Sequence, residues 1–245
     1  MNDAQSPIAS PFDARLQAKG LLRIARTGAL ATLDRASGAP LTTLVAVASD
    51  YNGAPLLLLS TLSQHTKNLA GDRRGSLLLT SPPGRGDPLN RPRLTVGGEI
   101  VAHPEPTARA RFLARNPKAR LYASFTDFSL FRVEISAVQF NGGFGRAAPL
   151  TPIDILTDMA GAEDLIEAEA ALLTETNARE AAYLASLAGD ERGDNKRRWR
   201  AIGLDPDGLD LAAGGRAARL GFAAPAATSQ AWREALGAFV DKRTG

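Results

Sequence analysis

Residues 28–60 read GALATL, DRASGAP, LTTLVAVA, SDYNGA and PLLLLS in order, so three short apolar runs alternate with two turn-forming segments. The apolar runs have the length and composition of β-strands. The segments between them are rich in Gly, Asn, Asp and Pro, the residues that favour tight turns. Strands joined by such short connections pair antiparallel. The stretch therefore predicts an antiparallel meander.

The pattern continues on both sides of this stretch. Apolar residues recur at helical intervals over Asp13–Arg26, which predicts an amphipathic helix ahead of the meander. Glycines 97 and 98 fall inside a later apolar run and are expected at a bulge. About six strands with helices at the crossings favour a closed or partly closed antiparallel β-barrel over a doubly wound parallel sheet. The further expected elements are helices over Ser63–Ala70 and Pro106–Asn116, a second helix leading into Phe125, and strands over Gly75–Thr80, Arg93–Ala102, Leu130–Ile135 and Ala137–Phe140.

The composition changes after Thr151. Residues 164–188 are rich in alanine and glutamate, which predicts a long helix or a helical pair. We expect an α+β chain in three parts: a flexible tail over residues 1–12, a barrel domain over 13–152 and a smaller α+β domain over 153–245. The short elements expected in the last part are strands over Trp199–Leu204, Leu209–Leu211 and Ala217–Phe222, and a capped helix over Trp232–Val240.

Cysteine and histidine counts restrict the chemistry. The 245 residues include no cysteine, which excludes disulfides and thiolate metal sites and fits a reducing cytoplasm. The two histidines, His65 and His103, lie 38 positions apart, so we expect neither a histidine-rich metal site nor a Ser-His-Asp triad. A formal net charge of +3 is too small to predict nucleic-acid binding. The longest apolar run, Pro55–Leu59, is far shorter than the roughly 20 residues of a membrane span, and the N-terminal residues do not resemble a signal peptide.

One segment gathers hydroxyl, imidazole, ammonium and amide groups where a strand ends and a helix begins: Ser60-Thr61-Leu62-Ser63-Gln64-His65-Thr66-Lys67-Asn68-Leu69. A helix N-terminus presents unpaired N–H groups and a partial positive charge, and Lys67 adds a full charge. These groups suit a phosphate monoester. The structural alternative, which spacing alone favours, makes Ser63 a helix cap, Lys67 a solvated charge and His65 a polar residue on the helix surface.

Two basic clusters also have two interpretations. Runs of this kind bind anions such as RNA or haem propionates, or they form a solvated surface. The small net charge favours the solvated surface. The first cluster is Arg109, Arg111, Arg115, Lys118 and Arg120, and the second is Lys196, Arg197, Arg198 and Arg200.

Four stretches occur in order along residues 13–150: Gly28–Leu33 leading to Pro40–Val45, Leu59–Leu69, Asn116–Ala119 with Tyr122 and Phe125–Phe131, and Gly142–Ala147. Together they resemble the pyridoxamine 5′-phosphate oxidase-related, FMN-binding split-barrel family, specifically its haem-utilisation branch. Residues 199–211 and 219–222 resemble the small C-terminal domain of that branch. The resemblance implies a six-stranded antiparallel split barrel, FMN as cofactor and a homodimer with the flavin at its two-fold interface.

The resemblance also implies which residues hold the FMN phosphate. The oxidases have a Ser-Arg-Lys triplet where this chain has residues 63–65, and a cation where it has a threonine on the second strand. Fewer charges imply weaker FMN binding. The implied FMN-binding residues are Thr43, Ser60, Thr61, Ser63, Gln64, His65 and Lys67.

Haem-degrading relatives use a histidine as iron ligand. The corresponding positions hold Ala147, Ala148 and Glu180, so we expect that any haem is not ligated by histidine and is not degraded. The leading expectation is a cytoplasmic, homodimeric FMN-binding protein, a flavin-dependent oxidoreductase whose substrate the sequence does not name. The alternative is a non-enzymatic protein of the same fold that binds haem or regulates a tetrapyrrole pathway.

Overall fold

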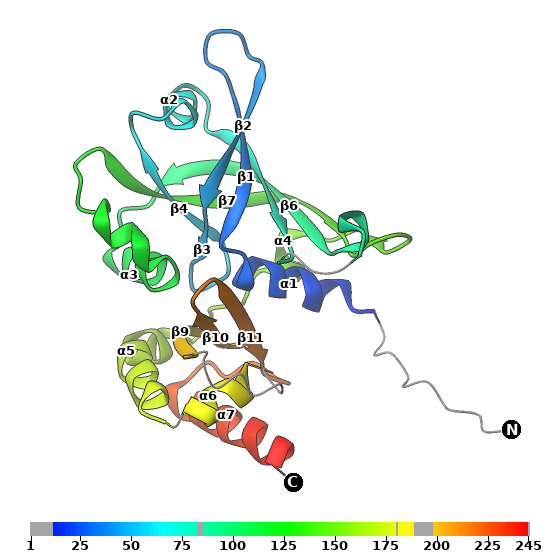
Figure 1. Cartoon of the computed structure of the whole chain (residues 1–245), viewed down its shortest axis with the longest axis vertical. Coiled ribbons are helices and arrows are strands. Elements are labelled where there is room, and N and C mark those ends of the chain that lie inside the picture. Colours follow the sequence, from blue (N-terminus) through cyan, green and yellow to red (C-terminus); the bar gives the residue numbers. More distant parts are fainter. Residues whose placement is uncertain (1–11, 83–85, 180, 189–197, 245) are drawn as a thin grey trace, which may run out of the picture.

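The computed structural model describes residues 12–82, 86–179, 181–188 and 198–244. The expected tail, except Phe12, lies outside these ranges. The described chain forms two antiparallel sheets with helices packed around them (Figure 1). The helices are α1 (Ala14–Ile24), α2 (Gln64–Gly71), α3 (Pro106–Arg115), α4 (Pro152–Ile155), α5 (Glu163–Asn177), α6 (Ala181–Leu187) and α7 (Ser229–Thr244), with short 3₁₀ turns η1 (Pro88–Asn90) and η2 (Pro117–Leu121).

The larger sheet runs in the order β2-β1-β5-β6-β7-β4-β3, with β8 paired to β7, and every pairing is antiparallel. It curls into a half-barrel, as the split-barrel expectation requires. The expected number of six strands is wrong: the sheet has eight, because two pairings of only two residues each add β3 and β8. The strands are β1 (Thr27–Leu33), β2 (Pro40–Ala46), β3 (Ala48–Ser49), β4 (Pro55–Ser60), β5 (Arg74–Thr80), β6 (Arg93–Ala102), β7 (Phe128–Asn141) and β8 (Ala147–Ala148).

One segment connects the two edges of this sheet. The strand expected over Leu41–Ala48 is divided at Val47: β2 pairs with β1 at one edge, and β3 pairs with β4 at the other. The buried Val47 donates its backbone N–H to the carbonyl of Arg26 at 2.9 Å. Because the chain passes directly from one edge to the other, the sheet curls back on itself.

The apolar run of β4 is explained by burial on both faces. Leu57 and Leu59 belong to the core inside the half-barrel, whereas Leu56 and Leu58 pack outside it in a cluster with Phe112 of α3. A strand covered on both sides carries no polar alternation. This burial fixes the end of β4, where the predicted phosphate segment begins.

The expected bulge is confirmed, and it joins two predicted strands into one. The register between β6 and β7 shifts between Gly97 and Gly98, because Gly97 pairs with Ala137 and Gly98 pairs with Ile135. Ser136 is therefore the extra residue. The break expected between two strands at this position is a bulge within the continuous strand β7.

The second sheet contains β9 (Arg200–Asp205), β10 (Gly208–Ala213) and β11 (Arg216–Gly221), close to the three strands expected there. Its core includes Trp232 and Leu236 of α7 and Leu165 and Leu172 of α5. The helical pair expected over residues 164–188 is α5 with α6, whereas the helix expected to lead into Phe125 is reduced to the short turn η2. The domain limits stay a prediction.

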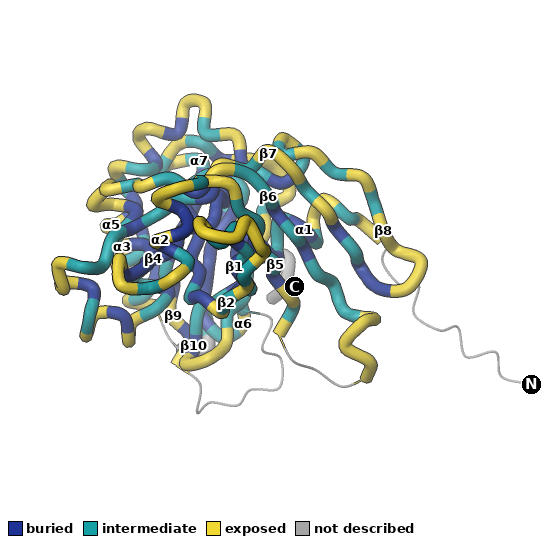
Figure 2. The backbone as a smooth tube through the Cα atoms, turned by 90° about the horizontal axis from the view of Figure 1, so that it is seen from above, coloured by how far each residue is buried: buried dark blue, intermediate teal, exposed yellow. Residues whose placement is uncertain are grey.

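Figure 1 shows the small sheet and its helices on one side of the half-barrel, beneath α1. Buried residues concentrate along the strands, and exposed residues follow the loops (Figure 2). In the part of the chain that the structure describes, no helix combines the length and the apolar character needed to cross a membrane.

Candidate functional site

The predicted phosphate segment connects β4 to α2. Ser63 occupies the N-cap of α2 in an extended conformation, but its side chain makes no capping hydrogen bond. Thr61 and Lys67 are exposed. Ser63 therefore lies at the helix cap, as the structural alternative predicts, although its side chain does not cap the helix, while Lys67 fits either interpretation.

One contact in this region joins a strand to the helix. Thr43 of β2 places its Oγ1 3.0 Å from Nδ1 of His65 on α2. His65 is partly buried, and this burial lowers the pKa of its imidazole below the ordinary value. The structure thus brings together two of the predicted FMN-binding residues that lie 22 positions apart in the chain.

Two other predicted residues are engaged elsewhere. Ser60 donates its hydroxyl to Asp127 Oδ2 at 2.6 Å, and Gln64 donates its Nε2 to Asn68 Oδ1 at 3.0 Å and to Asp34 Oδ2 at 3.3 Å. Sequence reasoning missed both carboxylates, because they come from distant loops. Asp34 and Asp127 add negative charge beside the segment, which opposes a phosphate dianion. Of the predicted set, Thr43, Thr61, Ser63, His65 and Lys67 are left to face an anion.

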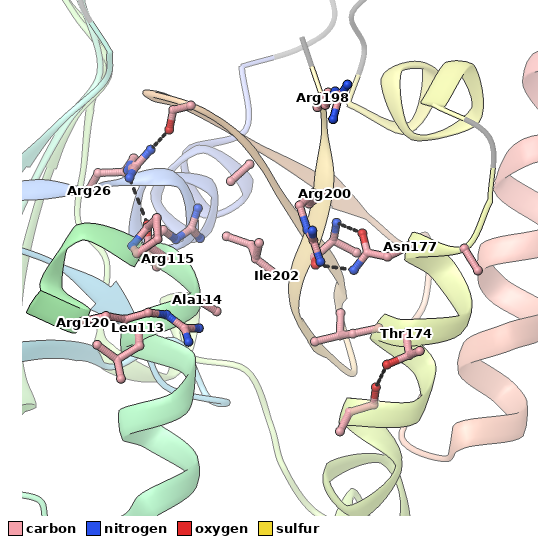
Figure 3. A pocket seen from close by; sticks show the side chains of 17 residues that line it. Arg26, Leu113, Ala114, Arg115, Arg120, Thr174, Asn177, Arg198, Arg200 and Ile202 are labelled. Atoms are coloured by element: carbon pink, nitrogen blue, oxygen red, sulfur yellow. Dashed lines mark hydrogen bonds between the residues drawn. The ribbon is translucent and has the colours of Figure 1, made fainter. Parts of the chain in front are cut away.

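A second region is a cavity of about 850 Å³ between the barrel side and the small sheet. Its walls come from α3 and η2 on one side and from α5 and β9 on the other (Figure 3). Apolar side chains include Leu113, Pro117, Leu173 and Ile202. Among the described residues that line it there are five arginines and no carboxylate: Arg26, Arg115, Arg120, Arg198 and Arg200.

Hydrogen bonds fix parts of the cavity wall. Arg26 donates to the carbonyl of Gly214 and, at 3.0 Å, to the carbonyl of Arg115. On the opposite wall the amide of Asn177 pairs with the backbone of Ala201, with both distances 2.9 Å. The labelled side chains of Arg120 and Arg200 lie on these two opposite sides (Figure 3). A ligand that entered the cavity would meet positive charge on both walls.

Arg115 connects the cavity to the interior. The residue is 3% exposed, and burial lowers its pKa to about 10. Nη2 donates to the carbonyl of Arg23 and lies 3.5 Å from Asp210 Oδ2, whereas Nη1 is buried without a hydrogen-bond partner. Arg115 is therefore a buried cation with one donor nitrogen, Nη1, that has no acceptor.

Behind the cavity, charges alternate along a chain of ion pairs, which we call the charge chain: Arg23, Asp205, Arg219, Asp210 and Arg115. Arg23 lies 3.0 Å from Asp205, and Arg219 lies 2.7 Å from Asp205 and 3.0 Å from Asp210. Arg23 and Arg115 come from α1 and α3, and the other three come from the small sheet. The charge chain therefore spans the junction between the two sheets.

A separate buried pair reinforces the junction. Arg111 of α3 pairs with Glu169 of α5, whose other oxygen accepts the hydroxyl of Tyr51 at 2.7 Å. The Arg111 guanidinium also lies 4.2 Å from the centre of the Tyr51 ring. Burial, together with the Glu169 carboxylate, raises the pKa of the Tyr51 hydroxyl.

The solvated interpretation of the basic clusters is wrong for Arg111 and Arg115, which are buried. A signal in the sequence is their spacing, since both fall on the face of α3 that carries Ala108 and Phe112. Arg198 and Arg200 of the second cluster line the cavity. Lys196 and Arg197, together with Glu180 from the expected haem-ligand positions, lie outside the described residues.

Comparisons with known proteins agree with the barrel. The family described as CREG, beta-barrel matches residues 12–155. The non-canonical haem oxygenase HOZ from the chloroplast of Arabidopsis thaliana is 34% identical over 113 residues, 45% of this chain and 34% of that protein. The chain thus spans about a third of the length of that curated relative.

Two solved structures cover almost the whole chain. A protein of unknown function from Agrobacterium tumefaciens is 39% identical, with a TM-score of 0.82, over 97% of this chain and 100% of that one. A haem-binding protein from Mycobacterium smegmatis is 27% identical, with a TM-score of 0.56, over 96% of this chain and 99% of that one. These matches fit the split-barrel superfamily expected from the sequence.

Proposed function

The chain belongs to the CREG β-barrel family, and we propose that it binds haem or a related tetrapyrrole in the arginine-lined cavity. The observation that carries this proposal is the chemistry of the cavity. Haem is a flat apolar ring with two carboxylates, and the cavity combines apolar walls with five arginines. Arginine is the side chain best suited to pair with a carboxylate. A volume of about 850 Å³ lies within the range of small-molecule sites.

The related proteins support this choice over the flavin expectation. Haem binding is named for the Mycobacterium smegmatis protein, and haem oxygenase activity for the Arabidopsis protein. This function corresponds to the alternative interpretation of the sequence, a haem- or tetrapyrrole-binding protein. Membership of the haem-utilisation branch is part of the same proposal. Neither His65 nor His103 is among the residues that line the cavity, so the arginines would hold the ligand without a histidine on the iron.

Titration with haem tests the proposal. Binding should shift the Soret band and saturate at one haem per chain. Arg200→Gln and Arg120→Gln, which remove exposed lining charges, should each weaken binding by about ten- to hundredfold, because a hydrogen bond to a charged group contributes roughly 1.5–3 kcal/mol. Arg74→Gln removes an equal charge from β5, away from the cavity, and serves as the matched control. Equal affinities for all four proteins would place the site elsewhere.

The contact between Thr43 and His65 favours a second candidate, an FMN phosphate site. Thr43, Thr61, Ser63, His65 and Lys67 would hold the phosphate, and bound FMN would supply the two-electron chemistry of an oxidoreductase. With one full cation and two nearby carboxylates, the binding should be weak. Lys67→Ala should reduce FMN affinity by about 1–3 kcal/mol and leave riboflavin, which lacks the phosphate, unchanged. Equal losses for both ligands would remove this site.

We also propose that the protein is a homodimer in the cytoplasm. Leu44 on the edge strand β2 is 77% exposed, Leu62 beside α2 is 73% exposed and Phe125 is 56% exposed. A second copy that covered these side chains would bury apolar surface and an open strand edge. Sedimentation should give about twice the chain mass of 25.8 kDa. The lack of cysteine supports the cytoplasmic location.

A further inference from the structure

Resting on the proposed function, we propose that the cavity recognises a carboxylate of the tetrapyrrole rather than its metal, and that Arg115 receives this carboxylate. The bound carboxylate then completes the charge chain between the two sheets. Ligand binding and the docking of the small sheet on the barrel are therefore linked. The ligand class is a tetrapyrrole with free carboxylates, whether or not it holds iron.

The charge chain carries an excess of positive charge. Its members alternate in sign but begin and end with an arginine, so three cations face two carboxylates. The neighbouring pair of Arg111 and Glu169 is neutral and does not change this excess. Four members of the charge chain are buried and the Arg219 side chain is 11% exposed, and an unbalanced charge in such surroundings is costly. One additional anion would neutralise it.

The hydrogen bonds and ion pairs of the individual arginines indicate where the additional anion would bind. Arg219 lies within 3.0 Å of carboxylates on both sides, and Arg23 lies 3.0 Å from Asp205 and donates to two carbonyls and a hydroxyl. Arg115 is 3.5 Å from its nearest carboxylate, and its Nη1 has no hydrogen-bond partner. Arg115 also lines the arginine-rich cavity. The incomplete end of the charge chain thus coincides with the ligand cavity.

A bound carboxylate would also stabilise the junction between the two sheets. Besides burial, the positive charges of Arg111, Arg26 and Arg23 act on Arg115 and lower its pKa. These four arginines precede the small sheet in the chain, whereas the carboxylate nearest to Arg115, that of Asp210, lies on β10. A ligand carboxylate at Arg115 would offset the repulsion among the arginines. It would therefore stabilise the folded arrangement in which α3 lies against the small sheet.

The side chains that the structure describes in the cavity lining do not suit an iron ion. The described residues that line the cavity include no histidine, methionine, tyrosine or carboxylate, and the chain has no cysteine. Arginine is permanently protonated under ordinary conditions and does not bind iron. The lining therefore contains groups that recognise carboxylates and lacks the usual axial ligands of haem. Removing the metal should leave recognition intact.

The first experiment compares three probes on the wild-type chain: haem, metal-free protoporphyrin IX and its dimethyl ester. Haem and the metal-free acid should bind with affinities within about threefold, and the ester should bind about ten- to hundredfold more weakly. A metal-free acid that binds more than tenfold more weakly than haem, or an ester that binds as well as the acid, overturns the inference and leaves haem binding intact. Failure of all three probes to bind overturns the proposed function itself.

The second experiment measures the link to folding. Metal-free protoporphyrin IX should raise the thermal unfolding temperature of the wild type and of Arg74→Gln equally, and should raise that of Arg115→Gln much less. Asp210→Asn provides an opposite test, because it removes the carboxylate nearest to Arg115 without touching the cavity lining. It should lower the stability of the ligand-free protein and tighten binding of the metal-free acid severalfold.

A residue that only supported the fold would give the opposite result for this variant. Unchanged or weaker binding to Asp210→Asn, with the protein folded, contradicts the inference. Where either variant does not fold, the comparison of acid and ester on the wild-type chain still decides it, because that comparison changes only the ligand.

Discussion

Arg111 of α3 and Glu169 of α5 form a buried ion pair across the junction between the half-barrel and the small sheet. Each partner has a second interaction that holds it in place. The Arg111 guanidinium lies over the Tyr51 ring, and Glu169 accepts hydrogen bonds from the Tyr51 hydroxyl and from the backbone N–H of Leu204. Four segments far apart in the sequence therefore meet at one pair of charges.

Glu169→Gln should destabilise the protein by about 3–5 kcal/mol, because it leaves the buried guanidinium without its counter-ion. Urea unfolding measures the change. The control is Glu175→Gln on the same helix, which breaks a pair with Arg233 whose side chains are both about half exposed. It should cost less than about 1 kcal/mol. Similar losses of unfolding free energy in the two variants would show that the buried junction pair stabilises the protein no more than an exposed pair does.

The glycines at the bulge offer a second matched comparison. A Cβ at Gly98 would lie 1.9 Å from the backbone oxygen of Glu134, whereas at Gly97 the nearest atom is the Cβ of Ala137 at 3.6 Å. Gly98→Ala should therefore destabilise the barrel by more than about 2 kcal/mol, and Gly97→Ala should stay within about 1 kcal/mol. Thermal unfolding checks both values. Equal effects would contradict the bulge geometry.

His65 should make stability depend on pH. Burial lowers its pKa below the ordinary 6.5, so the unfolded chain binds the proton more readily than the folded protein. Stability is full above this value and falls as the pH drops through it toward the lowered folded pKa. The decrease should be smaller in His65→Gln. NMR can follow His65 directly, with His103→Gln used to assign the two imidazole signals, and a midpoint at or above 6.5 for His65 would reverse the prediction.

Haem bound without a histidine ligand should not be degraded. Protein loaded with haem and given oxygen and a reductant should keep its Soret band and release no iron. Catalase-resistant conversion to a bile pigment would contradict this expectation. If His103→Ala abolished that conversion and His65→Ala did not, His103 would be the ligand that the cavity itself lacks.

The sequence predicted what depends on local pattern. The double-sided burial of β4 follows from an uninterrupted apolar run, and the bulge follows from two adjacent glycines opposite a break in apolar character at Ser136. The segment that joins β4 to α2 also lies where the pattern predicts it, and His65 of α2 contacts Thr43 of β2. Each of these features is encoded within a few neighbouring residues or by the order of the strands.

Features that depend on distant partners could not be predicted in the same way. In the sequence, Arg111 and Arg115 have the pattern of residues on a solvated basic helix. Their carboxylate partners, Glu169 and Asp210, lie 58 and 95 positions further along the chain. Asp34 and Asp127 lie in loops outside the predicted phosphate segment and accept hydrogen bonds from its side chains. Nothing in the sequence around either residue indicates this contact. The short strand β3 was missed because two paired residues are below the length at which alternation is visible.

The order of these charges along the chain sets an order in time. The arginines of α1 and α3 leave the ribosome before the carboxylates that pair with them. At synthesis rates of roughly 5–20 residues per second, the delay between Arg115 and Asp210 is on the order of ten seconds. During that interval the guanidinium groups of α3 exist without the carboxylates of α5 and β10, so these ion pairs form only after the small sheet has been made.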